Sequence, residues 1–429
     1  MILSVPGWPD IPFPLANCVC LWTADMGANI WTPTGMVPMT FSRPGEARTW
    51  RETPSGWVID VAAANAPRYF RGGMVFERSE AALDNLCLWS EDQTNGAYVA
   101  IGGGAAAASV VPAPEPGKTA CIVSGGAAGD GIKQSLVYAA AWYNFQVALR
   151  ADIPCTVKLS IDGGVTTRDV RVGTKWQVYM TNGWSGAANP KPAVIVGNTA
   201  GNNVYCFGWQ VQQNMCMLPS GYIPTTNARA NIGLEALQVP IASLPGFPTG
   251  AAASFTAMGC GLPWGAGWDG FLNITSAFNY PDGFEVSGMP LDIGGIGLIN
   301  VQKFTLFPAG EVRRDSCGSF GTPCVVLGNK KAGAGNTDLW TGGMQANTGN
   351  VAININAASQ LFIGGLAWGV SSRQLHGAMY AAAVFTPCLL PGYDTIIAVQ
   401  NWGLQAAYRL GANKGDIMSA WPGGASGIH

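Results

Sequence analysis

The chain has 429 residues, of which 11% are charged, and it carries a formal net charge of −2 with a pI near 5.7. This charge provides no basic field for a phosphate backbone, so we expect no nucleic-acid partner. The length predicts two or three domains, because a domain typically holds about 150 residues. Low charge combined with 16 Trp and 11 Tyr fits large subunit interfaces and a large β-core equally well, and both interpretations stay open.

The N-terminal segment has no basic stretch ahead of an apolar run, and its apolar residues are interrupted by prolines. It therefore predicts neither a signal peptide nor a membrane anchor. The first 80 residues contain several tryptophans but few periodic runs. We expect an extended arm that docks elsewhere, and a small β-element packed on the second domain is the alternative.

Eleven cysteines are spread along the chain without a CxxC pair or a Cys/His cluster. We expect buried, reduced thiols of a protein made in a reducing cytoplasm. Cys18 and Cys20 form the one close pair, and alternate residues of a strand share a face. A core position is favoured over a metal site for this pair, and neither a metal nor a cofactor is expected.

The middle of the chain alternates apolar and polar residues with a period of two. Strands that end on turn residues are expected at residues 143–151, 155–164, 167–173, 175–183 and 204–212. The first four recur at a spacing of roughly ten residues without intervening amphipathic helices, which predicts a sandwich or jelly roll. After Leu237 short strands separated by Gly, Asn and Pro resume and predict a second sandwich. One helix is expected between Pro391 and Gly411.

Three short motifs carry a resemblance to a known family: Asn65-Ala66-Pro67-Arg68, Trp89-Ser90-Glu91 and Tyr222-Ile223-Pro224-Thr225-Thr226. Further matching pieces are Arg43 with Gly45-Glu46-Ala47, the strand Trp57–Val61, Glu77, Asn85-Leu86 and the run "LFIGG" at 361–365. In this order they resemble a family of bacteriophage and prophage virion proteins. In that family a carbohydrate-binding-module-like jelly roll often precedes a concanavalin-like, laminin-G-like sandwich.

The resemblance implies a mostly β protein with four parts. They are an extended N-terminal arm or virion-anchoring region at 1–80, a jelly-roll β-sandwich at 81–227, a second, lectin-like β-sandwich with a short C-terminal helix at 228–410, and a tail at 411–429. Tyr222, Pro224 and Thr225 mark the boundary between the two sandwiches. There Pro224 ends the strand ladder, and the following polar residues begin a linker.

Catalysis is not expected from this sequence. The chain has only two histidines, which argues against a His-centred triad or a multi-His metal site. Clustered carboxylates are the remaining route to an enzyme, namely Glu77 with Glu80, Glu91 with Asp92, and Asp282 with Glu285. Neighbours on a strand diverge by face rather than converge on a substrate, so a glycan depolymerase is the least favoured alternative.

Binding a glycan requires less than catalysis, namely an aromatic platform and a few polar groups in a groove or loop cluster. Several tryptophans stand in Gly-rich loops, and Asp269 and Asp338 beside two of them offer hydrogen bonds to sugar hydroxyls or ligands for Ca²⁺, although single carboxylates are weak evidence for a cation site. The candidate carbohydrate-binding residues are Trp184, Trp264, Trp268, Asp269, Trp340 and Trp368. Burial in a core or at a subunit interface is the alternative for each tryptophan.

Residues and resemblance together predict a non-enzymatic structural protein of the virion, made in the bacterial cytoplasm and forming a tail fibre, spike or head decoration. The expected partners are further copies of the chain, with a homotrimer implied by the resemblance, other phage head or tail proteins, and a host-surface glycan. Neither a nucleic acid nor membrane insertion is expected. A capsid-bound decoration that only stabilises the particle is the alternative.

Overall fold

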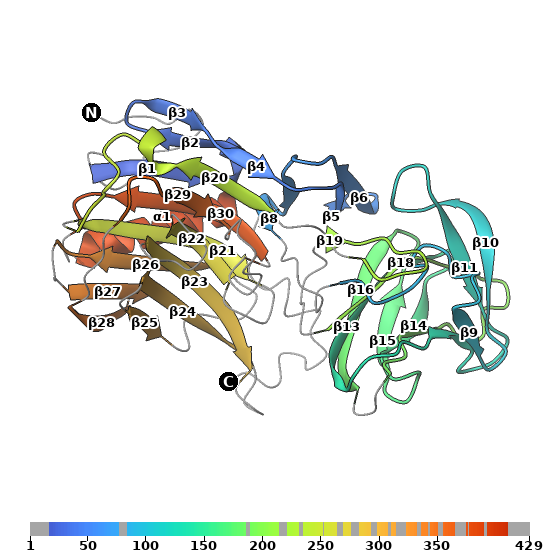
Figure 1. Ribbon diagram of the computed structural model, residues 1–429. Helices are drawn as coiled ribbons and strands as arrows, with labels where there is room; N and C mark the ends of the chain where they lie inside the picture. Colours follow the sequence, from blue (N-terminus) through green and yellow to red (C-terminus); the bar gives the residue numbers. More distant parts are fainter. Residues whose placement is uncertain are drawn as a thin grey trace. The chain divides into compact units, whose positions relative to one another are not determined.

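The computed structural model of the protein describes most of the chain. The described residues are 17–76, 84–185, 189–213, 221–230, 235–251, 253–263, 269–275, 283–292, 298–307, 310–314, 323–332, 336–341, 344–350, 355–364, 375, 377–389 and 393–410. Paired antiparallel strands dominate them, and one α-helix, α1 (Tyr393–Leu410), lies near the C-terminus (Figure 1). The predicted mostly β fold class is confirmed. No helix in the described part of the chain is long and apolar enough to cross a bilayer.

The described residues fall into two compact units, and each is built from separate stretches of sequence. The first unit takes residues 17–44, 64–76 and, with the gaps given above, 235–410. The second unit takes residues 45–63 and, again with gaps, 84–230.

Residues 1–80 were expected to form an extended arm, but their described part supplies strands to both units. β1 (Cys18–Thr23) pairs with β2 (Asn29–Thr32) and with β30 (Gly377–Phe385) of the first unit, and all six of its residues are buried. A strand covered on both faces shows continuous apolar residues rather than alternation, so its sequence lacks the period of two that indicates a half-buried strand.

The second unit contains two five-stranded sheets that share one hydrophobic core. One sheet has the order β10 (Ala105–Pro112), β11 (Thr119–Ser124), β18 (Val204–Gln213), β13 (Ala141–Ala151) and β16 (Gln177–Ser185). The other has the order β15 (Arg168–Val172), β14 (Cys155–Ser160), β17 (Ala193–Ile195), β12 (Gly131–Gln134) and β9 (Tyr98–Ile101). The five strands predicted between residues 143 and 212 correspond to β13, β14, β15, β16 and β18 and are confirmed.

A small third sheet joins the N-terminal part of the second unit to its C-terminal part. β5 (Ala47–Thr53) and β6 (Gly56–Ala62) form a hairpin, and β19 (Gly221–Tyr222) pairs with β5. Trp50 in this hairpin is fully buried, with its ring centroid 5.9 Å from that of Tyr222.

The first unit contains the two largest sheets of the described chain, and its main core cluster draws on both. The larger sheet has the order β28 (Met344–Asn350), β27 (Asn336–Thr341), β26 (Cys324–Lys330), β21 (Phe255–Pro263), β30, β1, β2 and β3 (Gly35–Pro38). Off this order, β8 (Gly73–Phe76) pairs with β30, and β7 (Arg68–Phe70) pairs with β8. The other has the order β25 (Gly310–Arg314), β24 (Leu298–Phe307), β23 (Gly283–Asp292), β22 (Asp269–Thr275), β29 (Gln360–Ile363), β20 (Ala236–Pro240) and β4 (Thr40–Ser42).

Helix α1 packs against β30, β21 and β26 of the larger sheet. A glycine inside the helix, Gly403, permits this contact, because a Cβ there would lie 3.0 Å from a methyl group of Val325 and 3.3 Å from the sulfur of Met258. The helix predicted between residues 391 and 411 is confirmed, and its internal glycine reflects close packing on the sheet.

Candidate functional site

The outer face of the β15-β14-β17-β12-β9 sheet presents a row of side chains that the strand register defines. Lys158 pairs with Ile195, Ile195 with Gly131, and Gly131 with Ile101. The residues that alternate with them along these strands, such as Val157, Leu159, Val194 and Ile132, belong to the hydrophobic core. Successive strand residues point to opposite faces, so the row from Lys158 to Ile101 points away from the core.

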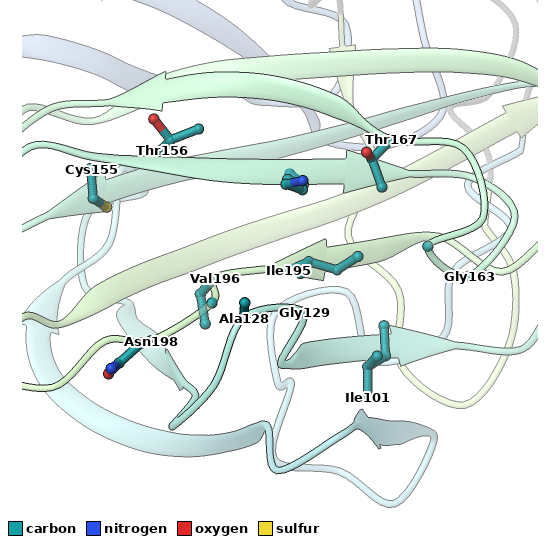
Figure 2. Close-up of a pocket in the computed structure, with 13 residues that line it drawn as sticks. Ile101, Ala128, Gly129, Cys155, Thr156, Gly163, Thr167, Ile195, Val196 and Asn198 are labelled. Atoms are coloured by element: carbon teal, nitrogen blue, oxygen red, sulfur yellow. The ribbon is translucent and has the colours of Figure 1, made fainter.

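A pocket of about 600 Å³ lies over this row. Its lining consists of Ile101, Ala128, Gly129, Cys155, Thr156, Lys158, Gly163, Gly164, Thr167, Ile195, Val196, Gly197 and Asn198 (Figure 2). Gly131 allows a close approach to β17, because a Cβ there would lie 2.2 Å from the Val194 carbonyl oxygen and 2.6 Å from the Ile195 Cα. The volume is in the range of sites that hold a small ligand or one to two sugar rings.

One carboxylate, that of Asp130, fastens the loops around the pocket. It accepts hydrogen bonds from the backbone N–H groups of Gly103, Gly126 and Ala127, each 2.9 Å long. The Asp130 backbone carbonyl accepts two more, from the N–H groups of Val196 and Gly197, at 2.9 and 3.0 Å. The N–H groups of Gly103, Gly126 and Ala127 lower the pKa of the Asp130 carboxyl from its ordinary value.

Replacing Asp130 by asparagine should therefore destabilise the second unit in a pH-dependent way. A carboxyl whose pKa is lowered by folding stabilises the protein above its unfolded pKa of about 4, and the contribution is lost as the pH falls through the folded pKa. We expect wild type to exceed Asp130→Asn in unfolding free energy at pH 7 and the difference to shrink toward about pH 2. Urea unfolding of both proteins across this pH range measures the difference in unfolding free energy. A difference that does not change with pH would contradict the stabilising role of the ionised Asp130 carboxylate.

The rim on the β14 side is a turn built on Asp162. Its carboxylate accepts hydrogen bonds from the Ser160 hydroxyl at 2.6 Å and from the Thr166 N–H at 2.9 Å. Burial alone would raise the pKa of Asp162, but these bonds outweigh burial and lower it. Gly163 and Gly164 follow with φ of 82° and 101°, values that only glycine adopts readily. The turn is therefore a fixed edge of the pocket.

The groups inside the pocket suit binding rather than catalysis. Lys158 offers an amine, Thr156 and Thr167 offer hydroxyls, and Asn198 offers an amide, over an apolar floor that includes Ile195. No carboxylate or imidazole occurs among these described lining residues. Burial raises the pKa of the Cys155 thiol despite a hydrogen bond with Asn202, so this sulfur is not an activated nucleophile at neutral pH.

The tryptophan candidates cannot be joined into a site. Trp264, Trp268 and Trp368 lie outside the described residues. Trp184, Asp269 and Trp340 have described backbones, in β16, β22 and β27 respectively, whereas their side chains lie outside the description. The first of these is in the second unit and the other two are in the first unit. Carbohydrate binding by these six residues stays a prediction.

The predicted boundary residues form a buried joint inside the second unit. The Tyr222 and Ser90 hydroxyls lie 2.9 Å apart, and the Thr225 N–H donates to the Ser90 hydroxyl at 2.8 Å. The Trp89 N–H donates to the carbonyl of Thr226 at 2.7 Å. Two of the motifs that carry the family resemblance thus bind each other directly and have a structural role.

The carboxylate pairs give no catalytic arrangement among the described side chains. Glu91 forms an ion pair with Lys118 at 3.0 Å, whereas Asp92 accepts hydrogen bonds from the N–H and hydroxyl of Thr94. The two carboxylates of this pair are therefore directed at different partners. Glu77, Glu80 and Asp282 lie outside the described residues, as does the side chain of Glu285.

The tryptophans of the sequence do not indicate this pocket, because none of its described lining residues is aromatic. The available signal was two Asp-Gly steps, Asp130-Gly131 and Asp162-Gly163, beside further glycines. Asp commonly hydrogen-bonds nearby backbone N–H groups where glycine takes left-handed conformations. Each Asp-Gly pair predicts a turn held by hydrogen bonds. The sequence does not show that both pairs lie beside the same outer face of the sheet, because this depends on the strand register.

Neither a protein-family model nor a curated protein matches the sequence significantly. Solved structures with some likeness include a CBM40 of the Ruminococcus gnavus IT-sialidase bound to α2,3-sialyllactose (TM-score 0.29, 12% identity, 38% of this chain and 92% of that one). Domain 4 of AbnA, a GH43 extracellular arabinanase from Geobacillus stearothermophilus, in complex with arabinotriose has a TM-score of 0.26 at 13% identity, over 40% of this chain and 77% of that one.

A third similar structure is the N-terminal CBM22 tandem domain of Paenibacillus barcinonensis Xyn10C, with a TM-score of 0.26 at 12% identity over 72% of this chain and 97% of that one. These neighbours are carbohydrate-binding modules or domains of carbohydrate-active enzymes. TM-scores this low carry no argument about function, so the pocket is interpreted from its own residues.

Proposed function

We propose that the protein is a non-enzymatic structural component of a bacteriophage virion that binds a host-surface glycan in the pocket over β14, β17 and β12. The observation that carries the binding role is the pocket itself. It combines a volume of about 600 Å³, rigid rims and several hydrogen-bonding side chains over an apolar floor. Sugars present hydroxyls and apolar C–H faces together, and these groups match such a lining.

The virion role is supported by the order of the motifs that resemble phage virion proteins. The proposal places the chain in a tail fibre, spike or head decoration, as a homotrimer that contacts other head or tail proteins. In such an assembly weak binding at each pocket is sufficient, because several copies on one particle bind together and raise the overall avidity.

Filling the pocket should abolish glycan binding. Thr156 is exposed on β14 and lines the pocket, so a tryptophan there would occupy ligand space without entering the core. We expect Thr156→Trp to lose at least about tenfold in affinity for any glycan that wild type binds, since every tenfold corresponds to about 1.4 kcal/mol of contacts. A glycan array followed by calorimetry on the bound glycans measures the loss.

Ala107→Trp is the matched control, because Ala107 is an exposed residue of β10 in the opposite sheet. It should bind as wild type does. Absence of binding by the wild-type protein to every host glycan would refute the glycan role. In that case a phage with the gene deleted would decide whether the protein only stabilises the particle, through its survival of heat and osmotic shock.

A further inference from the structure

Basic side chains gather around the pocket although the protein as a whole is slightly acidic. Lys158 lies in the pocket lining. Lys133 pairs across the sheet with Ala193, and Arg171 pairs with Thr156, so both lie on the same outer face. The chain stems of Lys133 and Lys191 run beside the pocket rim, because a Cβ on Gly163 would lie 3.8 Å and 3.3 Å from their Cδ atoms. One cation, Lys158, therefore lines the pocket, and Lys133, Arg171 and Lys191 lie beside it.

The acidic groups on this face neutralise only part of that charge. Asp169 pairs with Lys158 across the strands, with 4.0 Å between the carboxylate and the amine, and both side chains are more than half exposed. The Asp162 carboxylate is occupied by Ser160 and Thr166. Within the described part of the chain, no carboxylate forms an ion pair with Lys133, Lys191 or Arg171. The Asp130 carboxylate also lies near the pocket, held by the N–H groups of Gly103, Gly126 and Ala127. Four cations therefore stand against three carboxylates, which leaves an excess of one formal positive charge.

We infer that the pocket selects an acidic glycan, one whose sugars carry carboxylate groups, with Lys158 as the residue that contacts the negative charge. This inference rests on the proposed glycan binding and names its ligand class. The sugar hydroxyls form hydrogen bonds with the hydroxyls of Thr156 and Thr167 and with the Asn198 amide. A cationic face also raises the association rate of an anionic polymer. The overall charge of −2 opposes long polyanions such as nucleic acids, so recognition depends on the local pocket.

The test uses an array of paired glycans in which each acidic oligosaccharide has a neutral partner, such as trigalacturonate and its methyl ester. We expect wild type to bind acidic members at least about tenfold more tightly than their neutral partners. This preference should weaken between about 0.05 and 0.5 M salt, because salt screens the exposed charges. Lys158→Gln should lose the preference while keeping weak binding to both members.

Two variants make the assignment to Lys158 specific. Asp169→Asn removes the carboxylate beside Lys158 and should raise affinity for the acidic member about twofold to threefold. Lys118→Gln makes the same change in formal charge as Lys158→Gln, but in the turn between β10 and β11 of the opposite sheet, and should leave binding unchanged. If both lysine variants lost the same affinity for the acidic member, the preference would depend on the net charge of the protein rather than on Lys158. That result would overturn the inference.

The two proposals fail differently. Tight binding of neutral glycans that Thr156→Trp abolishes and Lys158→Gln does not affect would overturn the acidic specificity and leave the glycan role intact. If wild type binds no member of the array, both proposals are overturned.

Discussion

Replacing Glu235 by glutamine is expected to lower the unfolding free energy of the first unit by about 3 to 5 kcal/mol, the usual cost of breaking a buried ion pair from one side. Glu235 accepts from Arg43 Nη1 at 2.8 Å, from Arg68 Nε at 3.0 Å and from Arg68 Nη2 at 2.8 Å. The side chains of all three residues are at most 1% exposed. Without the carboxylate, two guanidinium groups stay buried with less compensation for their lost hydration.

This cluster ties three distant stretches of the first unit together. Arg43 follows β4, Arg68 begins β7, and Glu235 directly precedes β20. The Asn65 side chain also accepts from the Arg43 N–H at 3.0 Å, which joins two further pieces of the family resemblance. Hydrogen exchange measured by mass spectrometry should show faster exchange in β4, β7 and β20 of Glu235→Gln and little change in β13 and β18 of the second unit.

Asp60→Asn serves as the control, because it removes an ion pair with Arg51 in which both side chains are about half exposed. Its expected cost is below about 1 kcal/mol, as for most surface ion pairs. The triple variant Arg43→Met, Arg68→Met, Glu235→Leu should recover much of the stability lost in Glu235→Gln, since no charge is then buried. A loss below about 1 kcal/mol in Glu235→Gln would mean that the charges are hydrated in solution.

Elements with a clear period were predictable from the sequence, and elements defined by long-range pairing were not. β13 alternates apolar and polar residues from Tyr143 onward, and α1 has a helical apolar pattern between Pro391 and Gly411. β1 gave no such signal, because all six of its residues are buried in the sheet that it shares with β2 and β30. No local pattern indicates that residues 18–23 pair with a strand more than 350 residues later, since this pairing depends on the core of the whole unit.

The candidate site was less predictable than the fold for a related reason. Its lining comes from loops around Gly129, Gly163 and Asn198, which are separated in sequence and meet only through the strand register. Ser90 and the two arginines that bind Glu235 were visible in the sequence as parts of the motifs, but Glu235 was not, and neither was the role of these residues in holding the chain together. A sequence motif alone does not tell whether its residues stabilise the fold or bind a ligand. The contacts that these residues make in the structure distinguish the two roles.

Replacing Asn85 by alanine is expected to lower the unfolding free energy of the second unit by about 3 kcal/mol or more. The fully buried side chain donates to the carbonyls of Trp209 at 2.9 Å and Ile223 at 2.7 Å. Its oxygen accepts from the N–H groups of Cys87 and Val211, both at 3.1 Å. Each bond contributes about 1 kcal/mol, and alanine would leave four buried backbone groups without this partner. Chemical denaturation monitored by tryptophan fluorescence measures the loss.

Asn202→Ala is the matched control, because the Asn202 side chain makes two hydrogen bonds of 2.8 Å with the backbone of Ile153 at an exposed site. Water can replace those bonds, so the cost should stay near 1 kcal/mol or below. A structural joint and a ligand site also predict opposite results for Asn85→Ala. A joint requires lower stability, with glycan affinity preserved in the fraction that is folded. Unchanged stability with lost glycan affinity would instead assign Asn85, and the motifs that meet beside it, to a binding site.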